Sequence, residues 1–409
     1  GQMKLPDEIY REMMAVGPRK SPRRLMALFL ILLLIGAGAF LVGISGSQAH
    51  RAWQAFLINF LFWAGLSAGA MLFVAVLNMT NSRWGRPMKR PAEALGAFLP
   101  VAFLLFWVLY FGREEIFPWV RQPVPGKETW LSAGFLFGRN GFGLFLLMAA
   151  SMALLYYSLR MDREVRTPPQ REKDWRMQII FSPILGILYA LVLSLFAFDL
   201  IMSLDPHWYS TLFGAYYFIG SFYTALAALI LLSGLTRNPL GLEKFIQPRH
   251  FHDMGKLLLG FCLITGDFFY SQFLVIWYGN LPEETRYVIL RVRQSPWEPL
   301  AWTVLVVAFV IPFVVLLSRK IKLRPKPMMV LGGIILLGMW LEKLLLVAPS
   351  LWKGQEIPLG LSEILITAGF LGMMALSVTV FLRKFPLLPL SDPLFRESRE
   401  EAQAPEVLG

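Results

Sequence analysis

Ten apolar stretches of about 18 to 25 residues run through this chain of 409 residues, and each is long enough for a helix that crosses a bilayer. They cover residues 25–45, 53–77, 94–111, 140–159, 183–204, 211–235, 254–278, 300–318, 328–348 and 362–382. Together they take up about half of the sequence, so little is left for a soluble catalytic domain. The sequence therefore predicts an all-α integral membrane protein with ten transmembrane helices.

Charge supports this prediction and gives an orientation. The chain is 56% hydrophobic and only 16% charged, with a net charge of +12. Of the Lys and Arg residues, 28 lie on the side of both termini and 8 on the other. Such a bias predicts cytoplasmic termini, so the positive charge is topological and does not indicate nucleic-acid binding. The first stretch lacks a small-residue cleavage site, and we expect it to be retained as a helix.

The residues that bind most redox cofactors are scarce. Cys262 is the single cysteine, and the four histidines, His50, His207, His250 and His252, fall in loops or at helix ends. An iron–sulfur cluster needs several thiolates, and a membrane haem needs axial histidines from helices. We therefore expect no haem, cluster, metal or nucleotide bound by this chain, and no catalytic residue.

Stretches two to five and six to nine resemble two copies of one unit. Stretch three ends WVLYFGREE and stretch seven ends IWYGNLPEE, and Asp199 and Glu342 each lie seven residues before a proline. Four helices is an even number, so the copies would share one orientation. The prediction is a bundle over 53–204 and a second over 205–348, flanked by peripheral helices in 25–52 and 349–382, with a basic arm (1–24) and a cytoplasmic tail (383–409). Chance recurrence of aromatic–Gly endings is the alternative.

Ionisable residues inside the apolar stretches each need an explanation, because placing a charged side chain in the middle of a membrane helix costs about 2.5–3.5 kcal/mol on insertion scales. Asp199, Asp267, Glu342 and Lys343 are such residues, and the polar residues that accompany them are Ser203, Tyr270, Ser271 and Asn59. One hypothesis is hydrogen-bonded pairing that fixes helix packing. Another is a proton relay, since carboxyl groups in a dry bundle can take up and release protons. A substrate-ion site is a third.

The positions of two basic residues on their helices predict where their side chains lie. Adjacent helix positions do not face each other, so Glu342 and Lys343 are expected to find partners on other helices, with Lys343 contacting Asp267 or Asp199. Arg139, at the mouth of stretch four, is expected to extend toward the surface; a place in the same polar interior as Asn59 is the alternative.

Outside the membrane, the link between stretches five and six carries Asp205, His207 and Tyr209. This cluster suits either a quinol head group or a turn beside an aromatic belt. Glu283 and Glu284 lie on the same side and offer an acidic docking surface.

Two strings, SLDPHWYSTLFGAYYFIG (203–220) and FCLITGDFFYSQFLVIWYGNLPEETRY (261–287), resemble the NrfD/polysulfide-reductase membrane-subunit family. Within it they are most similar to the F-type subunits of alternative complex III, a bacterial quinol:electron-acceptor oxidoreductase. The resemblance implies a plasma-membrane complex with an NrfD-like C subunit, an iron–sulfur B subunit, and multihaem and monohaem cytochrome c subunits. The haem and clusters would belong to those partners. This chain would anchor the complex in contact with lipid or quinone, and Asp199, Asp267 and Glu342 match intramembrane relay positions.

A stand-alone secondary transporter and a purely structural scaffold are the competing interpretations. Transporter repeats often contain helices broken at matched positions. Here Pro312 lies inside an apolar stretch, with no counterpart in stretch four, which disfavours the transporter.

Overall fold

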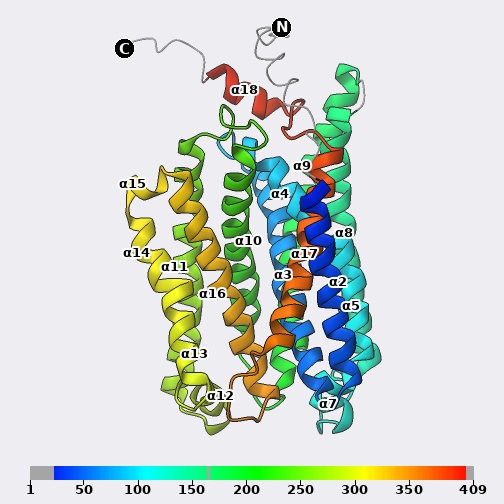
Figure 1. Ribbon diagram of the computed structural model, residues 1–409, viewed down its shortest axis with the longest axis vertical. Coiled ribbons are helices and arrows are strands. Elements are labelled where there is room, and N and C mark those ends of the chain that lie inside the picture. The colour runs from blue at the N-terminus through cyan, green and yellow to red at the C-terminus, as the bar shows by residue number, and fades with distance from the viewer. Residues whose placement is uncertain (1–22, 164–165, 402–409) are drawn as a thin grey trace.

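A computed structural model of the protein describes residues 23–163 and 166–401, and the described chain folds into helices without strands (Figure 1). Ten of its helical segments are long and apolar enough to span a membrane. In chain order they are Arg23–Ser45 (α2), Ala49–Met79 (α3), Arg86–Phe111 (η1, α4 and α5), Ala133–Arg163 (α8), Pro168–Leu204 (α9, η2 and η3), Phe213–Arg237 (α10), Pro248–Gly279 (α11), Trp297–Leu317 (α13, η4 and α14), Pro325–Leu351 (α16) and Leu361–Lys384 (α17). The predicted fold class is confirmed.

Several segments continue beyond the predicted stretches, because hydropathy marks only the part of a helix inside hydrocarbon. Helix α8, for example, begins at Ala133 and ends at Arg163, with basic residues in its last turn. Shorter helices complete the ends of the molecule: α6 (Arg113–Ile116), α7 (Pro118–Arg121), α12 (Pro282–Val292), α15 (Arg319–Lys322) and α18 (Pro393–Glu401). We call the two ends of the bundle the α18 end and the α12 end (Figure 1).

The eight central spans pack as two groups of four. In the first, α3 packs on α5 and α9, and α8 packs on the same two helices. In the second, α10 packs on α11 and α16, α13 packs on α16, and α11 packs on α14. Contacts of α10 with α3 and α9 join the groups.

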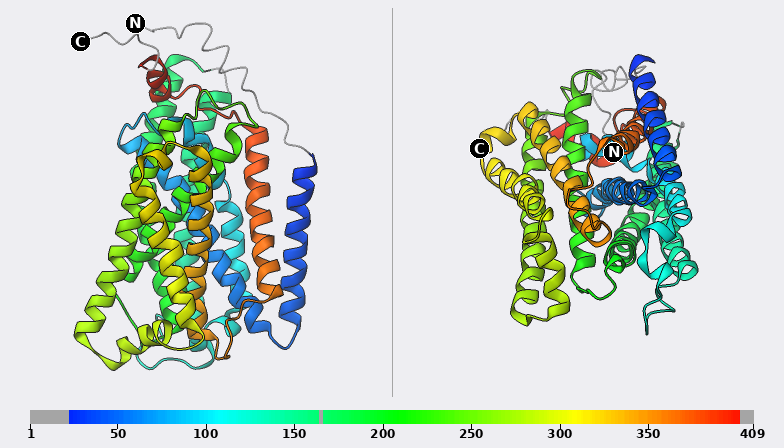
Figure 2. Two further views of the ribbon diagram at one scale, coloured as in Figure 1. Left: turned by 60° about the vertical axis from the view of Figure 1, so that its left-hand side comes forward. Right: turned by 60° about the horizontal axis from the view of Figure 1, so that its bottom comes forward.

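The first and last spans pair with each other at the edge of the molecule (Figure 2). Their backbones touch where Gly36 of α2 meets Gly369 of α17, since a Cβ built on Gly36 would lie 2.3 Å from the Gly369 Cα. Small residues of this kind let membrane helices approach closely. Because α17 also packs on α3, this pair covers the first group from outside.

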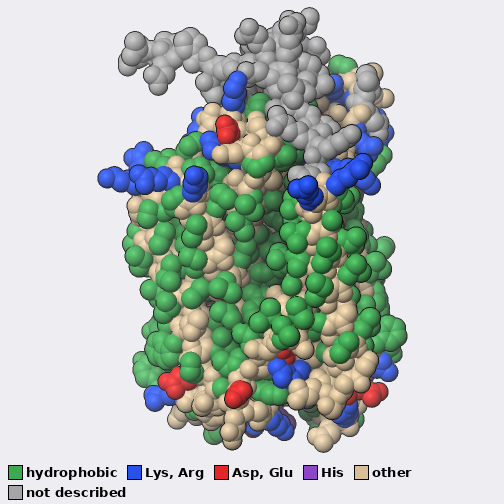
Figure 3. All heavy atoms as spheres, viewed as in Figure 1, with side chains coloured by type: hydrophobic (Ala, Val, Ile, Leu, Met, Phe, Trp, Pro, Cys, Tyr) green, Lys and Arg blue, Asp and Glu red, His purple; other side chains and the backbone are tan. Residues whose placement is uncertain are grey.

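On the face shown in Figure 3, apolar side chains cover the middle of the molecule and charged side chains lie toward both ends. Large hydrophobic side chains of α2 and of other outward helices are exposed there, including Leu34 and Val42. A soluble monomer rarely exposes such an area, so this surface is the one that lipid covers in a multi-pass membrane protein.

The C-terminal tail is more ordered than its Pro- and Glu-rich composition suggests. Leu387 and Leu388 are buried at the α18 end, and so is Phe395 in α18. Residues 1–22 of the basic arm and residues 402–409 of the tail lie outside the described residues.

Candidate functional site

Asp199 is fully buried near the α12 end and receives four hydrogen bonds. Arg139 of α8 donates from Nε and Nη2 to the two carboxylate oxygens, at 2.8 Å each. Asn140 donates at 2.5 Å, and the Trp130 indole at 3.2 Å. The expectation that Arg139 extends to the surface is therefore wrong. Its guanidinium neutralises Asp199 and lies 3.7 Å from the centre of the Trp130 ring.

The backbone around Asp199 is a π-helical turn, η2 (Ala197–Ile201), at the end of α9. The extra residue in such a turn interrupts the regular helix, and π-turns are frequent at functional sites. One turn on, Ser203 donates to the Asp199 carbonyl oxygen and accepts a 3.3 Å bond from Trp119. Ser203 therefore lies beside Asp199, as helical spacing predicts.

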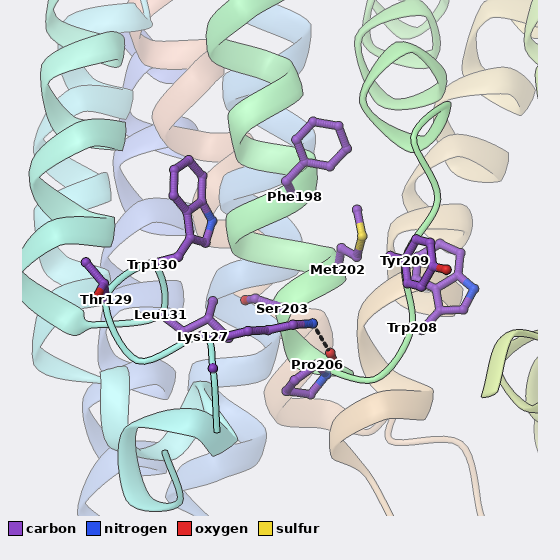
Figure 4. Close-up of a pocket in the computed structure, with 11 residues that line it drawn as sticks. Lys127, Thr129, Trp130, Leu131, Phe198, Met202, Ser203, Pro206, Trp208 and Tyr209 are labelled. Atoms are coloured by element: carbon purple, nitrogen blue, oxygen red, sulfur yellow. Dashed lines mark hydrogen bonds between the residues drawn. The ribbon is translucent and has the colours of Figure 1, made fainter. Parts of the chain in front are cut away.

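A cavity of about 400 Å³ lies beside this turn, between the loop before α8 and the link before α10 (Figure 4). Lys127 crosses it and donates to the Pro206 carbonyl oxygen at 2.7 Å. Trp130 and Ser203 line it, as does Tyr209 from the other side. Because Trp130 also donates to Asp199, the indole contacts both the cavity and the carboxylate.

Glu342 and Lys343, both buried in α16, bind each other at 2.5 Å. The expected contact of Lys343 with Asp267 or Asp199 is therefore wrong. Helical spacing separates the two backbone positions, but the long flexible side chains reach one another around the helix surface. Two tyrosines of α10 lie beside this pair. The Lys343 Nζ is 5.1 Å from the centre of the Tyr217 ring, and Tyr216 interacts with Glu342.

Asp267 and Asn59 lie in different surroundings. Asp267, on α11, is exposed in the chain and lines a second cavity together with Tyr270. Ser271 follows them on α11 without lining that cavity. Asn59 binds Thr367 of α17 at 3.0 Å and Trp340 of α16 at 3.1 Å, so it holds α3 against those helices. It does not join the surroundings of Asp199.

The polar groups of the link between α9 and α10 differ in their partners and exposure. Asp205 accepts hydrogen bonds from Arg286 at 3.2 and 3.3 Å, whereas His207 and Tyr209 are exposed. Glu283 and Glu284 occupy the first turn of α12, where acidic residues stabilise the helix dipole. The geometry favours a turn beside an aromatic belt over a binding site shared by Asp205 and His207.

A charged cluster at the α18 end was not predicted. It consists of the buried residues Arg86, Lys89, Arg90, Glu93 and Asp392, together with Asp162, whose side chain is 1% exposed. Lys89 donates to Asp392 at 2.8 Å and Arg86 donates to it at 3.1 Å, while Arg90 pairs with both Glu93 and Asp162. Three cations and three anions thus compensate one another within the first group of helices.

The tail closes this cluster. Burial by itself would raise the pKa of Asp392, but Lys89 and Arg86 beside it outweigh burial and hold that pKa below its ordinary value. The backbone N–H of Ser391 also donates to Asp162 at 2.6 Å. In the sequence, the cluster could have been recognised only from the string GRPMKRPAE (85–93). Its three cations look like those of an ordinary positively charged cytoplasmic loop.

A polar stripe on α8 connects the two regions. Asn140 and Ser151 are eleven residues apart, and Ser151 and Ser158 are seven apart, so the three share one face of the helix, and all are buried. Ser158 donates to Glu93 at 2.5 Å at one end, and Asn140 binds Asp199 at the other. The Ser151 hydroxyl and the Asn140 Oδ1 have no hydrogen-bond partner among the residues that the structure describes. Such polar atoms commonly bind buried water.

Within residues 23–163 and 166–401, no group of three or more His, Cys, Asp or Glu is arranged to hold a metal ion. A search of curated proteins gives no match. The sequence model of the family described as "Polysulphide reductase, NrfD" matches residues 43–353, which include both groups of four helices. The chain therefore belongs to the NrfD family of polysulphide reductase membrane subunits.

Proposed function

We propose that this chain is the F-type membrane subunit of an alternative complex III, and that it anchors the complex and relays protons through buried acids. NrfD subunits are integral membrane proteins, usually of quinone-interacting oxidoreductase complexes, and they generally partner with iron–sulfur and other redox subunits. The finer assignment rests on the two strings at 203–220 and 261–287. The specific partners are then an NrfD-like C subunit, an iron–sulfur B subunit and cytochrome c subunits, which would carry the clusters and haem.

The polar stripe of the first group carries the relay proposal. It leads from a compensated charge cluster at the α18 end to Asp199 near the α12 end, through groups on one helix face. The gap between Asn140 and Ser151 is about 16 Å along the helix, from the rise per residue. The Asn140 and Ser151 oxygen atoms without partners among the described residues can bind water. A chain of such water molecules would have to carry protons across the gap between these two residues.

The second group supplies two further candidate acids. Glu342 is buried beside Tyr216 and Lys343, and Asp267 lines a cavity without an ion pair among the described residues. The two groups of four helices pack in a matching way, which supports a repeated four-helix unit. In this unit Asp199 and Glu342 take equivalent places. We propose that each unit contributes one acid of the relay.

The orientation follows from charge. The excess of Lys and Arg at the α18 end supports a proposal in which this end is cytoplasmic and α12 lies outside. A bacterial plasma membrane is part of the same proposal and rests on the resemblance to alternative complex III. Labelling of a cysteine introduced at exposed His207 should therefore occur from outside intact cells.

Purification through an affinity tag on this chain tests the complex. Extraction in mild detergent should yield partners that contain iron and haem, in fixed proportion to the chain. Recovery of the chain alone, folded and without such partners, would exclude the oxidoreductase assignment and leave the transporter.

Neutral variants test the acids of the second group. Since Asp267 has no ion pair among the described residues, Asp267→Asn should leave assembly intact and lower proton uptake during turnover. Glu342→Gln should also lower uptake, but it leaves Lys343 buried without its partner and should reduce stability as well. Glu284→Gln, in the first turn of α12, is the matched control and should change neither quantity. Unchanged proton stoichiometry in both assembled variants would remove the second group from the relay.

A further inference from the structure

Asp267 is an acid in the middle of a membrane span that its own chain leaves uncompensated. It lies halfway along the apolar stretch 254–278 of α11, and its side chain is exposed. It makes no hydrogen bond or ion pair with residues 23–163 or 166–401, which the structure describes. Lys256 of the same helix, about 16 Å away along the axis, pairs with Asp253 at 3.0 Å. A carboxylate at this depth is costly in lipid, so another group must compensate it.

Asp267 belongs to an outward stripe on α11 with heptad spacing. The residues of this stripe, which alternate three and four positions apart, are Gly260, Leu263, Asp267, Tyr270, Leu274 and Trp277. Leu263, Tyr270 and Trp277 are 44%, 57% and 62% exposed, and a Cβ built on Gly260 would meet nothing within 4 Å. Two membrane helices that cross at about +20° pack along a seam with this spacing, and one polar side chain in the seam fixes their register.

The part of α11 that carries most of the stripe receives little support from its own chain. Among residues 266–279 only Ile276 is buried. The second cavity borders the stripe, since Asp267 and Tyr270 line it. In two views α11 stands at the edge of the molecule, opposite α2 (Figure 1 and Figure 2). The stripe is therefore open to a neighbour within the membrane.

The length of the stripe indicates what kind of neighbour covers it. From Gly260 to Trp277 the helix rises about 26 Å, close to the hydrocarbon thickness of about 30 Å. A lipid chain covers the apolar positions but has no group that compensates a carboxylate. A transmembrane helix covers the whole stripe and also places a basic side chain at the depth of Asp267, where buried charges pair with one another.

We infer that the stripe is the docking seam for one transmembrane helix of a partner subunit, and that this helix carries a lysine or arginine opposite Asp267. The inference deepens the proposed function and rests on it in one respect, because the chain must have a membrane partner. It requires neither electron transfer nor a proton path.

Photocrosslinking of the tagged complex in native membranes tests the seam. p-Benzoylphenylalanine replaces Leu263 in one variant and Leu274 in another. Leu104 of α5, which is 66% exposed in the first group of helices, is the matched control position. The first two positions should crosslink to one helix of one subunit, at sites roughly eleven residues apart, with a basic residue between those sites. Leu104 should not crosslink to that helix.

Charge reversal tests the pair itself. Asp267→Lys places two cations opposite each other and should lower recovery of the crosslinked subunit about tenfold or more. Leu104→Lys adds a cation at the control position and should leave that recovery unchanged. Asp267→Asn keeps an acceptor oxygen in the seam, so the subunit should stay bound. Replacing the partner's basic residue by Glu in the D267K background should restore recovery, which a misfolded variant would not show.

Crosslinks to lipid alone, to a second copy of this chain, or to a helix without a basic residue would overturn the inference. Full recovery of the subunit with D267K would do so too. Copurified iron and haem partners without any crosslink from Leu263 or Leu274 would refute the seam and leave the proposed function intact. A crosslinked basic helix in a preparation without iron or haem would support the seam and refute the oxidoreductase assignment.

Discussion

Asp199 and Glu342 are both buried acids near the α12 end, but their charges are compensated differently. Asp199 receives its cation from another helix, with further donors from Asn140 and Trp130. Glu342 is paired with Lys343, its neighbour in the same helix, and it borders a large cavity. The first ion pair joins α8 to the end of α9, whereas the second lies within α16 and contacts α10 only through Tyr216 and Tyr217. Burial alone thus does not say whether a charge pair stabilises helix packing.

The comparison predicts its largest effect at Arg139. Arg139→Met leaves the Asp199 carboxylate buried without a cation, and we expect a loss of about 3–5 kcal/mol in the free energy of unfolding. Denaturant titration of the purified chain in bicelles measures this loss. The double variant R139M/D199L should recover much of it, because both charges are then gone. A double variant no more stable than R139M would show that the pair itself is not the cause.

Lys343→Met should cost less, about 2 kcal/mol in the same titration. Glu342 keeps its interaction with Tyr216 and can be neutralised from the adjacent cavity. If Lys343→Met lowered the free energy of unfolding as much as R139M does, Glu342 would be as fully enclosed as Asp199. The proposed difference between the two groups of helices would then be wrong.

Asp392 extends the comparison to the α18 end. There too, an acid is neutralised by cations from another segment, because Asp392 of the tail pairs with Arg86 and Lys89. Asp392→Asn should loosen the tail, so that amides of residues 386–398 exchange hydrogen roughly 30-fold faster at pH 7, equivalent to about 2 kcal/mol. In the parent, the lowered pKa of Asp392 means that its stabilisation is complete above the ordinary Asp pKa of about 4 and is lost only as pH falls through the lowered value. Protection corrected for intrinsic exchange should therefore be the same at pH 5 and pH 7. A loss of protection between these values would contradict the pairing with Lys89 and Arg86.

Asn59 gives the smallest expected effect. Its bonds to Thr367 and Trp340 hold helices together, and Asn59→Leu should cost about 1 kcal/mol, since such bonds are weak on average in membranes. Proton stoichiometry should not change, as Asn59 lies outside the polar stripe. A drop in stoichiometry with normal assembly would return Asn59 to the relay.

The sequence predicts the helices well because bilayer thickness dictates their length, and hydropathy reports that length directly. It predicts much less of the site. The bond between Arg139 and Asp199 joins residues 60 positions apart, and it depends on how α8 is rotated against α9. The pairing of Glu342 with Lys343 depends on side-chain rotamers. The cluster of Arg86, Lys89 and Arg90 looks like a cytoplasmic loop until the tail supplies Asp392.

The central claim, that Asp199 carries protons along the first group, is tested most directly by the proton stoichiometry of a charge-free variant. D199N/R139Q removes both buried charges and keeps polar side chains, so the complex should assemble. Proton uptake per electron pair is measured in proteoliposomes during quinol oxidation, with Asp205→Asn as the control at a surface acid. The account predicts that quinol oxidation largely persists and that uptake falls in D199N/R139Q alone. An assembled variant with unchanged proton uptake would contradict it.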